Sequence, residues 1–469
     1  MSKPAPGQRR LTVRRARTLI ETLLLGLLVG VLSDRYGWEP ALSIRDGWET
    51  AASLIQLVDN AWFDGPLVAV GDHAPRGPVG ATRYAAGAKS PILAATGGPE
   101  VTLFDDSGTV LHRWRVPVET LFTVPALMRA EDATIDGYRL LADGSLLAIV
   151  SYETRFPSFR WGDVTMNTVL AKIDAQSALI WTYQGNPHHD LATLETGETY
   201  VLVARDGATP TRKGTLLPRR FRDEGIAILD PAGHETKTIW LGEALANSPY
   251  AWLEAEFGSK RCYRDEQYCW DLFHANSIEV LSRETAAQLP VAEPGDLLVN
   301  LRALDSVVVV DPVTERVRWA LHGSWHRAHD VHATASGTLM MFDNLGNIGG
   351  LEPSRIVEID PRSGATLWQY DGGRRHPFFS SIRGNAEPLA NGDVLVTESM
   401  GGRIFEVSRA GEIAWEYVSP PARNSDAAPI IWGGRRIDPA DYPFLSDGGT
   451  GQIVANPANN TGSGRLSRE

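Results

Sequence analysis

The chain of 469 residues has a hydrophobic fraction of 43% and a charged fraction of 22%, an ordinary balance for a folded globular protein that excludes wholesale disorder. The net charge of −12, without a basic stripe interleaved with aromatic residues in the body of the chain, excludes nucleic acid as a partner. The 45 glycines and 14 tryptophans, against 6 methionines, favour strands and turns over helices.

The N-terminus carries the only concentrated positive charge, and an apolar stretch follows it directly. Thr18–Leu32, TLIETLLLGLLVGVL, is apolar except for its threonines and Glu21. A basic flank before a short apolar stretch is the layout of an export signal. Because no small-x-small cleavage site precedes Asp34, we predict that residues 1–35 form an uncleaved signal anchor. This membrane-anchor helix would place the rest of the chain on the extracytoplasmic, periplasmic side; a buried helix is the alternative.

The remaining chain divides by composition into three parts. Residues 36–62 have the pattern of a helical juxtamembrane segment. Residues 63–448 carry internal repeats and form the predicted catalytic domain. The tail, residues 449–469, is rich in Asn, Gly and Ser and is predicted to be disordered.

One repeated unit is an apolar run, a turn with Asp, Gly or Pro, and a short strand that ends on Trp. The six copies end at Trp114, Trp181, Trp240, Trp319, Trp368 and Trp415. Each copy has the pattern of a β-hairpin, because β-branched runs flank a cluster of turn residues.

A second repeated unit lies between copies of the first and consists of a glycine followed by an apolar strand. Its copies begin at Gly144, Gly197, Gly295, Gly337 and Gly392. The two units together give about four strands per repeat, which is the composition of a propeller blade. We therefore predict an all-β, six-bladed β-propeller. A long β-sandwich or solenoid would explain the alternating strands but not a four-strand unit repeated six times.

The longest interval between repeats contains an insertion at about Ala244–Asp271, which includes the only cysteines, Cys262 and Cys269. In an exported protein such a close pair usually forms a small-loop disulfide. Two free thiols are the alternative, and the sequence leaves the pairing open.

Three histidines occupy matching points of different repeats. His189 and His329 each stand eight residues before a repeat glycine, and His274 opens another repeat. The innermost strand of a propeller blade begins near the central channel, so residues at matching points converge on one axis. Polar groups brought together in this way are a candidate site, although a single histidine would more often be structural.

A metal site is the first chemical alternative for these histidines, because His326, His329 and His332 are close in sequence. In an extended segment successive side chains alternate between faces, so His329 would point away from the other two. We therefore predict that no metal is bound.

Several motifs occur in one order along the chain. They are HHDL at His188, DLFHANS at His274, LVNLR ending at Arg302, AHD at His329, FDN at Asn344 and SRIVEID at Ser354. With NAEPLANGDVLVTE and GRIFEV, they resemble the bacterial arylsulfate sulfotransferases, which are six-bladed propellers. The resemblance runs from about Leu103 to Val418.

The resemblance implies an enzyme that moves a sulfuryl group from an aryl sulfate donor to a phenolic acceptor, without a nucleotide donor or other cofactor. The reaction would be ping-pong, through a sulfohistidine. By motif match His329 is the nucleophile, and His189, His274 and Arg302 surround the sulfate. Further candidates for substrate binding are Asn344, Arg355 and His188.

This chemistry is reasonable for the residue types concerned. Neutral imidazole, with a reference pKa of about 6.5, is available as a nucleophile at neutral pH. Arginine can hold sulfate oxygens by charge-assisted hydrogen bonds, and a histidine can protonate the departing phenolate.

Two other functions remain open from the sequence. A quinoprotein-like dehydrogenase has similar strand repeats, but here six residues separate the cysteines and no acidic cluster marks the repeat openings. A non-catalytic, membrane-anchored propeller scaffold would make the histidines dispensable. The natural donor and acceptor, and whether the chain forms a homodimer, are not determined.

Overall fold

The computed structural model describes residues 77–85, 90–122, 130, 133–153, 166–206, 222–253, 272–344, 354–421 and 428–445. The predicted anchor, the juxtamembrane segment, the two cysteines and the predicted tail lie outside these residues. Within the described part of the chain, no helix combines the length and the apolar character needed to cross a membrane.

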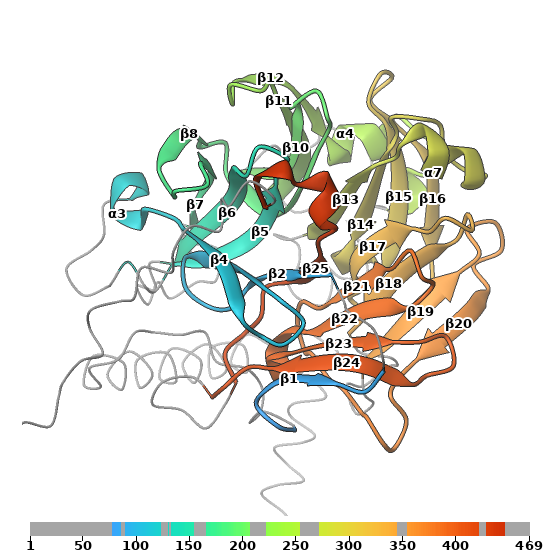
Figure 1. The fold of residues 1–469 in the computed structure, drawn as a ribbon. Coiled ribbons are helices and arrows are strands. Elements are labelled where there is room, and N and C mark those ends of the chain that lie inside the picture. The colour runs from blue at the N-terminus through green and yellow to red at the C-terminus, as the bar shows by residue number, and fades with distance from the viewer. Residues whose placement is uncertain are drawn as a thin grey trace, which may run out of the picture.

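The described chain forms six antiparallel sheets arranged in a ring, which confirms the predicted six-bladed β-propeller (Figure 1). Blade 1 contains β2 (Ile92–Ala95), β3 (Glu100–Phe104), β4 (Val110–Arg115) and β25 (Gly434–Arg436). Blade 2 contains β5 (Thr134–Leu140), β6 (Leu146–Glu153), β7 (Met166–Ile173) and β8 (Leu179–Tyr183). Blade 3 contains β9 (Pro187–Thr193), β10 (Thr199–Asp206), β11 (Arg222–Leu229) and β12 (Glu235–Trp240).

Blade 4 contains β13 (Ala275–Val280), β14 (Leu297–Leu301), β15 (Ser306–Asp311) and β16 (Arg316–His322). Blade 5 contains β17 (His329–Ala333), β18 (Leu339–Asp343), β19 (Arg355–Ile359) and β20 (Thr366–Tyr370). Blade 6 contains β21 (Asn385–Pro388), β22 (Val394–Glu398), β23 (Arg403–Val407), β24 (Ile413–Val418) and β1 (Gly80–Arg83). The short helices are α3 (Val118–Leu121), α4 (Leu241–Ala246), α7 (Arg283–Gln288) and the 3-10 turns Arg302–Leu304, Ser399–Gly401, Pro439–Asp441 and Pro443–Leu445.

Strands from the two ends of the described chain close the ring. The N-terminal β1 pairs with β24 as the outermost strand of blade 6, and the C-terminal β25 pairs with β2 as the innermost strand of blade 1. Full closure removes most of the exposed sheet edge that an open ring would leave.

Both repeat units of the sequence have structural counterparts. The six repeat tryptophans lie on β4, β8, β12, β16, β20 and β24. These are the outermost strands of blades 1 to 5, and in blade 6 β24 lies next to the outermost β1. The five repeat glycines stand two residues before the second strand of their blades, and all have positive φ. Gly337, with φ 78°, illustrates why, because its turn closes between Thr334 and Thr338 and a Cβ would lie 2.2 Å from the carbonyl oxygen of Gln288.

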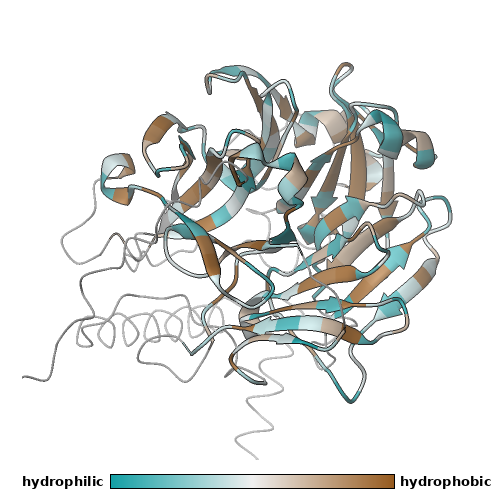
Figure 2. Cartoon of the chain, in the orientation of Figure 1, coloured by the Kyte–Doolittle hydropathy of each residue, from teal (hydrophilic) through white to brown (hydrophobic). Residues whose placement is uncertain are grey.

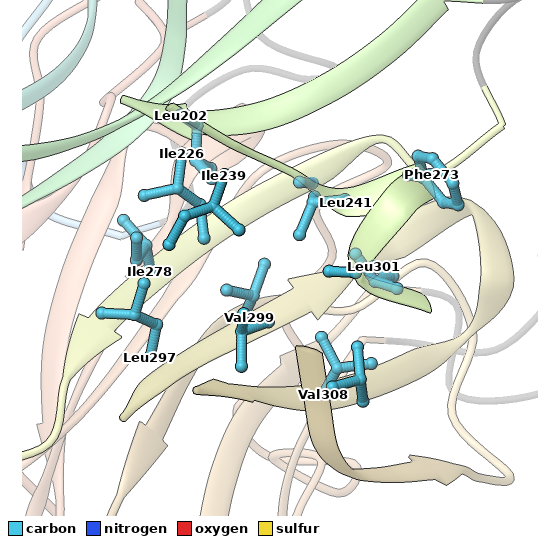
Figure 3. Close-up of a cluster of buried hydrophobic side chains, with 14 of the residues drawn as sticks. Leu202, Ile226, Ile239, Leu241, Phe273, Ile278, Leu297, Val299, Leu301 and Val308 are labelled. Carbon is cyan, nitrogen blue, oxygen red and sulfur yellow. The ribbon is translucent and has the colours of Figure 1, made fainter. Parts of the chain in front are cut away.

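The hydrophobic core is divided among the interfaces between blades. Six clusters of buried side chains each join two neighbouring sheets, including the interface between blades 6 and 1. Figure 3 shows the cluster between blades 3 and 4, where Ile226 and Ile239 face Ile278 and Val299. Figure 2 shows hydrophobic stretches along the strands and hydrophilic residues in many turns. Packing thus holds each blade against two others and fixes the innermost strands around one axis.

Candidate active site

Irregular innermost strands direct polar side chains toward the propeller axis. The pairing of the first two strands shifts register in blades 2, 3, 4 and 5. The shifts fall at Asp136, at His188 to Asp190, at Asn276, and between His329 and His332. Such β-bulges re-aim side chains locally. His189 and His274, with φ of 57° and 48°, adopt the left-handed backbone that is uncommon for non-glycine residues.

A cavity of about 50 Å³ lies where these strands converge. Its lining includes His189 and His329, together with Asp136, Tyr138, Arg139, Asp190, Asn276, Asp330, Arg383, Trp432 and Arg435. These residues come from all six blades or the segments beside them. The two histidines therefore share one small polar cavity, although they are 140 positions apart in the sequence.

His329 is buried, and a single tautomer satisfies its neighbours. The amide nitrogen of Asn344 donates to the carbonyl oxygens of Ser380 and Arg383, so Oδ1 of Asn344 faces Nδ1 of His329 at 2.6 Å. Nδ1 must then carry the proton and donate it. The backbone N–H of Arg383 donates to Nε2 of His329 over 3.3 Å. Nε2 is consequently the nitrogen with the free electron pair.

The electrostatic surroundings keep His329 uncharged. Burial, and next the positive charge of Arg302, lower the pKa of His329 well below the ordinary value, although the hydrogen bond to Asn344 acts in the opposite direction. A neutral imidazole with an available Nε2 is the form that can act as a nucleophile.

His189 and His274 lie beside each other, as the resemblance implied. Their ring centroids are 4.8 Å apart in an edge-to-face arrangement. Burial and the neighbouring His274, His188, Arg383 and His329 hold the pKa of His189 well below its usual range.

A backbone hydrogen bond joins Arg302 to His274. Arg302 begins the 3-10 turn after β14, and its N–H donates to the carbonyl oxygen of His274 over 3.2 Å. The positive charge of Arg302 lowers the pKa of His329, which disfavours a proton on that imidazole. His189, His274, His329 and Arg302 are thus brought together from three blades.

The three residues predicted to bind substrate, Asn344, His188 and Arg355, are not part of the cavity lining. Asn344 orients His329 and is fully buried. His188 is 2% exposed and lies behind His189, outside the cavity lining. Arg355 also lies outside the lining, and its Nε donates to Oδ2 of Asp343 over 2.9 Å.

The sequence analysis missed several cavity residues. Nη2 of Arg383 donates to Oδ1 of Asp136 over 3.0 Å, and its guanidinium carbon lies 3.2 Å from the ring centroid of Trp432. Asp136 and Arg383 stand at the openings of blades 2 and 6, as His189 and His329 do in blades 3 and 5. Asp136 stands eight residues before Gly144, as His189 and His329 stand before their repeat glycines, so the same spacing indicates it. Arg383 stands nine residues before Gly392 and does not follow that spacing.

Several of the charged residues that line the cavity form ion pairs. Arg139 donates to Asp190 over 2.9 Å, and Arg435 lies 3.6 Å from Asp330. Nε2 of His332 lies 3.1 Å from Oδ2 of Asp330. Although burial opposes both shifts, this pairing raises the pKa of His332 to about 10 and lowers the pKa of Asp330. Within the described ranges, no cluster of three or more His, Cys, Asp or Glu residues is arranged to hold a metal ion.

The sequence matches the model of the arylsulfotransferase (ASST) family over residues 140–420. This segment is more than half of the chain and includes every candidate catalytic histidine and Arg302. The chain belongs to the arylsulfotransferase family. No curated protein matches the sequence.

Solved structures resemble this arylsulfotransferase-family propeller only distantly. A protein of unknown function from Bacteroides caccae is 10% identical, covers 73% of this chain and 98% of its own, and has a TM-score of 0.44. A streptogramin B lyase is 11% identical, with coverages of 75% and 89% and a TM-score of 0.37. The WD40 propeller domain of Doa1 is 10% identical, with coverages of 75% and 86% and a TM-score of 0.37. At these scores the likenesses carry no argument about function.

Proposed function

We propose that this protein transfers a sulfuryl group from an aryl sulfate to a phenol by a ping-pong reaction through a sulfohistidine at His329. The observation that carries the proposal is the hydrogen-bonded state of His329, whose Nδ1 is bound by Asn344 while Nε2 keeps its electron pair at the cavity. Family membership supplies the reaction class.

In the first half-reaction Nε2 of His329 attacks the sulfur, and the bond between sulfur and the aryl oxygen breaks. The sulfur takes the place of the weak contact from the N–H of Arg383. The departing phenolate takes up a proton and leaves as the phenol. Negative charge on the sulfate oxygens is stabilised by Arg302, which acts on His329 electrostatically.

In the second half-reaction the acceptor phenol loses its proton, and its oxygen attacks the sulfur. The bond between sulfur and Nε2 breaks, which restores neutral His329. Exclusion of water from the cavity would favour transfer over hydrolysis of the intermediate.

The test uses the full-length protein in detergent, because of its predicted anchor, with 4-nitrophenyl sulfate as donor and a second phenol as acceptor. We expect release of nitrophenol that depends on the acceptor and gives parallel double-reciprocal plots. His329→Ala should reduce turnover to background, since it removes the nucleophile. His234→Ala, whose side chain is 80% exposed in the β11–β12 turn, should retain wild-type activity. Turnover that survives in His329→Ala would contradict the proposed intermediate, and a wild-type protein inactive with several donors would favour a scaffold.

A further inference from the structure

His188 contacts His189 through the Nδ1 atoms of the two rings. The two Nδ1 atoms lie 2.8 Å apart, and the rings are perpendicular with centroids 5.0 Å apart. One of these nitrogens must donate a proton to the other. Because Nδ1 of His189 is engaged by His188, Nε2 is the His189 nitrogen left for a substrate in the cavity.

A buried carboxylate stands on the other side of His188. Glu224 on β11 is 1% exposed, and its Oε1 lies 3.7 Å from Nε2 of His188. Its Oε2 accepts the backbone N–H of Ala275 over 2.6 Å, directly after His274. The carboxylate is therefore held in place by the first residue of β13, which directly follows the candidate catalytic His274. Removing such a charge from water is costly unless an opposite charge or donors face it.

Among the described neighbours, the two histidines face groups of different charge. His189 faces His188, His274, His329 and the cation Arg383, whereas His188 faces Glu224 and His189. Burial and these neighbours disfavour a positive charge on His189, since they lower its pKa well below the ordinary value. A positive charge on His188 would instead lie beside a carboxylate.

We propose that His189, His188 and Glu224 form a proton relay, in which His189 exchanges protons with the phenols and His188 stores the proton beside Glu224. This inference rests on the proposed sulfuryl transfer and assigns the acid and base that the reaction needs. His189 acts on the substrate, whereas His188 and Glu224 act through it as positioning residues.

The proton balance closes over the two half-reactions. As the donor's phenolate leaves, Nε2–H of His189 protonates the phenolate oxygen, and doubly protonated His188 passes its Nδ1 proton to Nδ1 of His189. His188 is then neutral and keeps its other proton on Nε2, on the side of Glu224. In the second half-reaction the acceptor O–H gives its proton to Nε2 of His189, and Nδ1–H of His189 returns a proton to Nδ1 of His188. His189 is neutral at the end of each exchange, and one proton is carried between phenols.

The first test compares two donors in the half-reaction that forms the intermediate. The nitrophenolate of 4-nitrophenyl sulfate leaves without a proton, whereas the phenol of phenyl sulfate has a pKa of about 10, like that of tyrosine, and needs one. In Glu224→Gln we expect the rate with phenyl sulfate to fall on the order of 10²-fold, and with 4-nitrophenyl sulfate by less than about threefold. The glutamine oxygen can still accept the N–H of Ala275, so the strand contact is kept. His188→Gln should show the same selectivity, and Glu224→Asp should restore part of the rate with phenyl sulfate.

Glu406→Gln is the matched control. Glu406 lies on β23 of blade 6, away from the relay, and is also 1% exposed. It pairs with Arg436 on β25 of blade 1 over 2.9 Å. Its replacement should change both donors by the same factor. The relay would be overturned if Glu224→Gln lowered the rates with the two donors by the same factor, or lowered neither rate.

The second test does not depend on turnover. In ¹⁵N-histidine spectra of the wild-type protein, the shared proton should reside on Nδ1 of His188, and it should move to Nδ1 of His189 in Glu224→Gln. A proton that stays on the same ring in both proteins overturns the relay. If the protein showed this movement of the proton from His188 to His189 and yet transferred no sulfuryl group, the result would support the relay and contradict the proposed function.

Discussion

At the scale of single residues, the reactivity of His329 depends on two contacts that fix its tautomer. Asn344 can present only Oδ1 to the imidazole, because its amide nitrogen is used by the carbonyl oxygens of Ser380 and Arg383. The Nδ1 proton therefore stays on the side of Asn344, and Nε2 stays unprotonated toward the cavity. The nucleophile needs no separate base of its own.

The first prediction at this scale concerns pH. An ordinary histidine becomes protonated as the pH falls through about 6.5, and its imidazole can then no longer act as a nucleophile. Burial and the facing groups Arg302, His274 and Arg383 lower the pKa of His329, with Asn344 opposing. The half-reaction with 4-nitrophenyl sulfate should therefore keep its rate as the pH falls from about 8 to about 6, measured by rapid-quench kinetics. A decline centred near about 6.5 would contradict this pKa shift.

The second prediction concerns Asn344. Replacement by Ala removes the acceptor for Nδ1–H, so the ring can turn or change tautomer. We expect formation of the intermediate to slow by about 10²-fold, as for a misplaced reacting group. The variant also leaves the buried carbonyl oxygens of Ser380 and Arg383 without this donor, so the free energy of unfolding should fall by about 1–3 kcal/mol. Pre-steady-state nitrophenol release measures the rate. Full activity in Asn344→Ala would show that the orientation of His329 has another cause.

At the scale of strands, the bulges on the innermost strands position the site. A regular strand would alternate its side chains between the two faces of the blade, and the register shifts instead re-aim Asp136 and His189. Adjacent innermost strands are then fastened by side chains that accept backbone N–H groups. Asp190 accepts from Ile278 over 3.0 Å, Ser277 from Val331 over 3.1 Å, and Asp330 from Ala386 over 3.0 Å.

Gly137 provides the prediction at this scale. A Cβ on this β5 residue would lie 2.4 Å from the carbonyl oxygen of His189 and 3.2 Å from Cα of Asp190. Gly137→Ala should push β9 outward, cost about 1–3 kcal/mol of unfolding free energy and reduce sulfuryl transfer. Gly392→Ala is the control, because its Cβ meets nothing within 4 Å although φ is 87°. It should lose about 1–2 kcal/mol with unchanged activity. Denaturant unfolding and steady-state rates compare the two, and equal activities would contradict the close approach of β5 to β9.

At the scale of the whole molecule, the ring is closed by strands from both ends of the described chain. The C-terminal β25 lies next to the axis and carries Arg435, which is 3.6 Å from Asp330 in blade 5. The N-terminal β1 lies at the outer edge of blade 6, where none of its residues is fully buried. The inner strand thus contributes to both closure and the channel, and the outer strand only to closure.

Truncation separates these contributions. A chain ending before Gly434 loses the innermost strand of blade 1 and the partner of Asp330, so we expect a marked fall in Tm and loss of activity. Deletion of Gly80–Arg83 removes only an edge strand and should lower Tm less while activity persists. Circular dichroism melts and turnover measure both. Equal losses in the two proteins would contradict the unequal roles of the closing strands.

The sequence by itself determined the blade count, the strand and turn positions and the matching repeat positions of three histidines. These features depend on local chemistry, because turn glycines, β-branched runs and matching repeat positions can be read from neighbours in sequence. Only the tertiary structure decided which side chains meet. Arg355 pairs with Asp343, while Arg383 enters the cavity and Glu224 lies behind His188. Those positions depend on bulges, on the order of blades around the axis and on which partner satisfies each buried charge, and sequence spacing encodes none of the three.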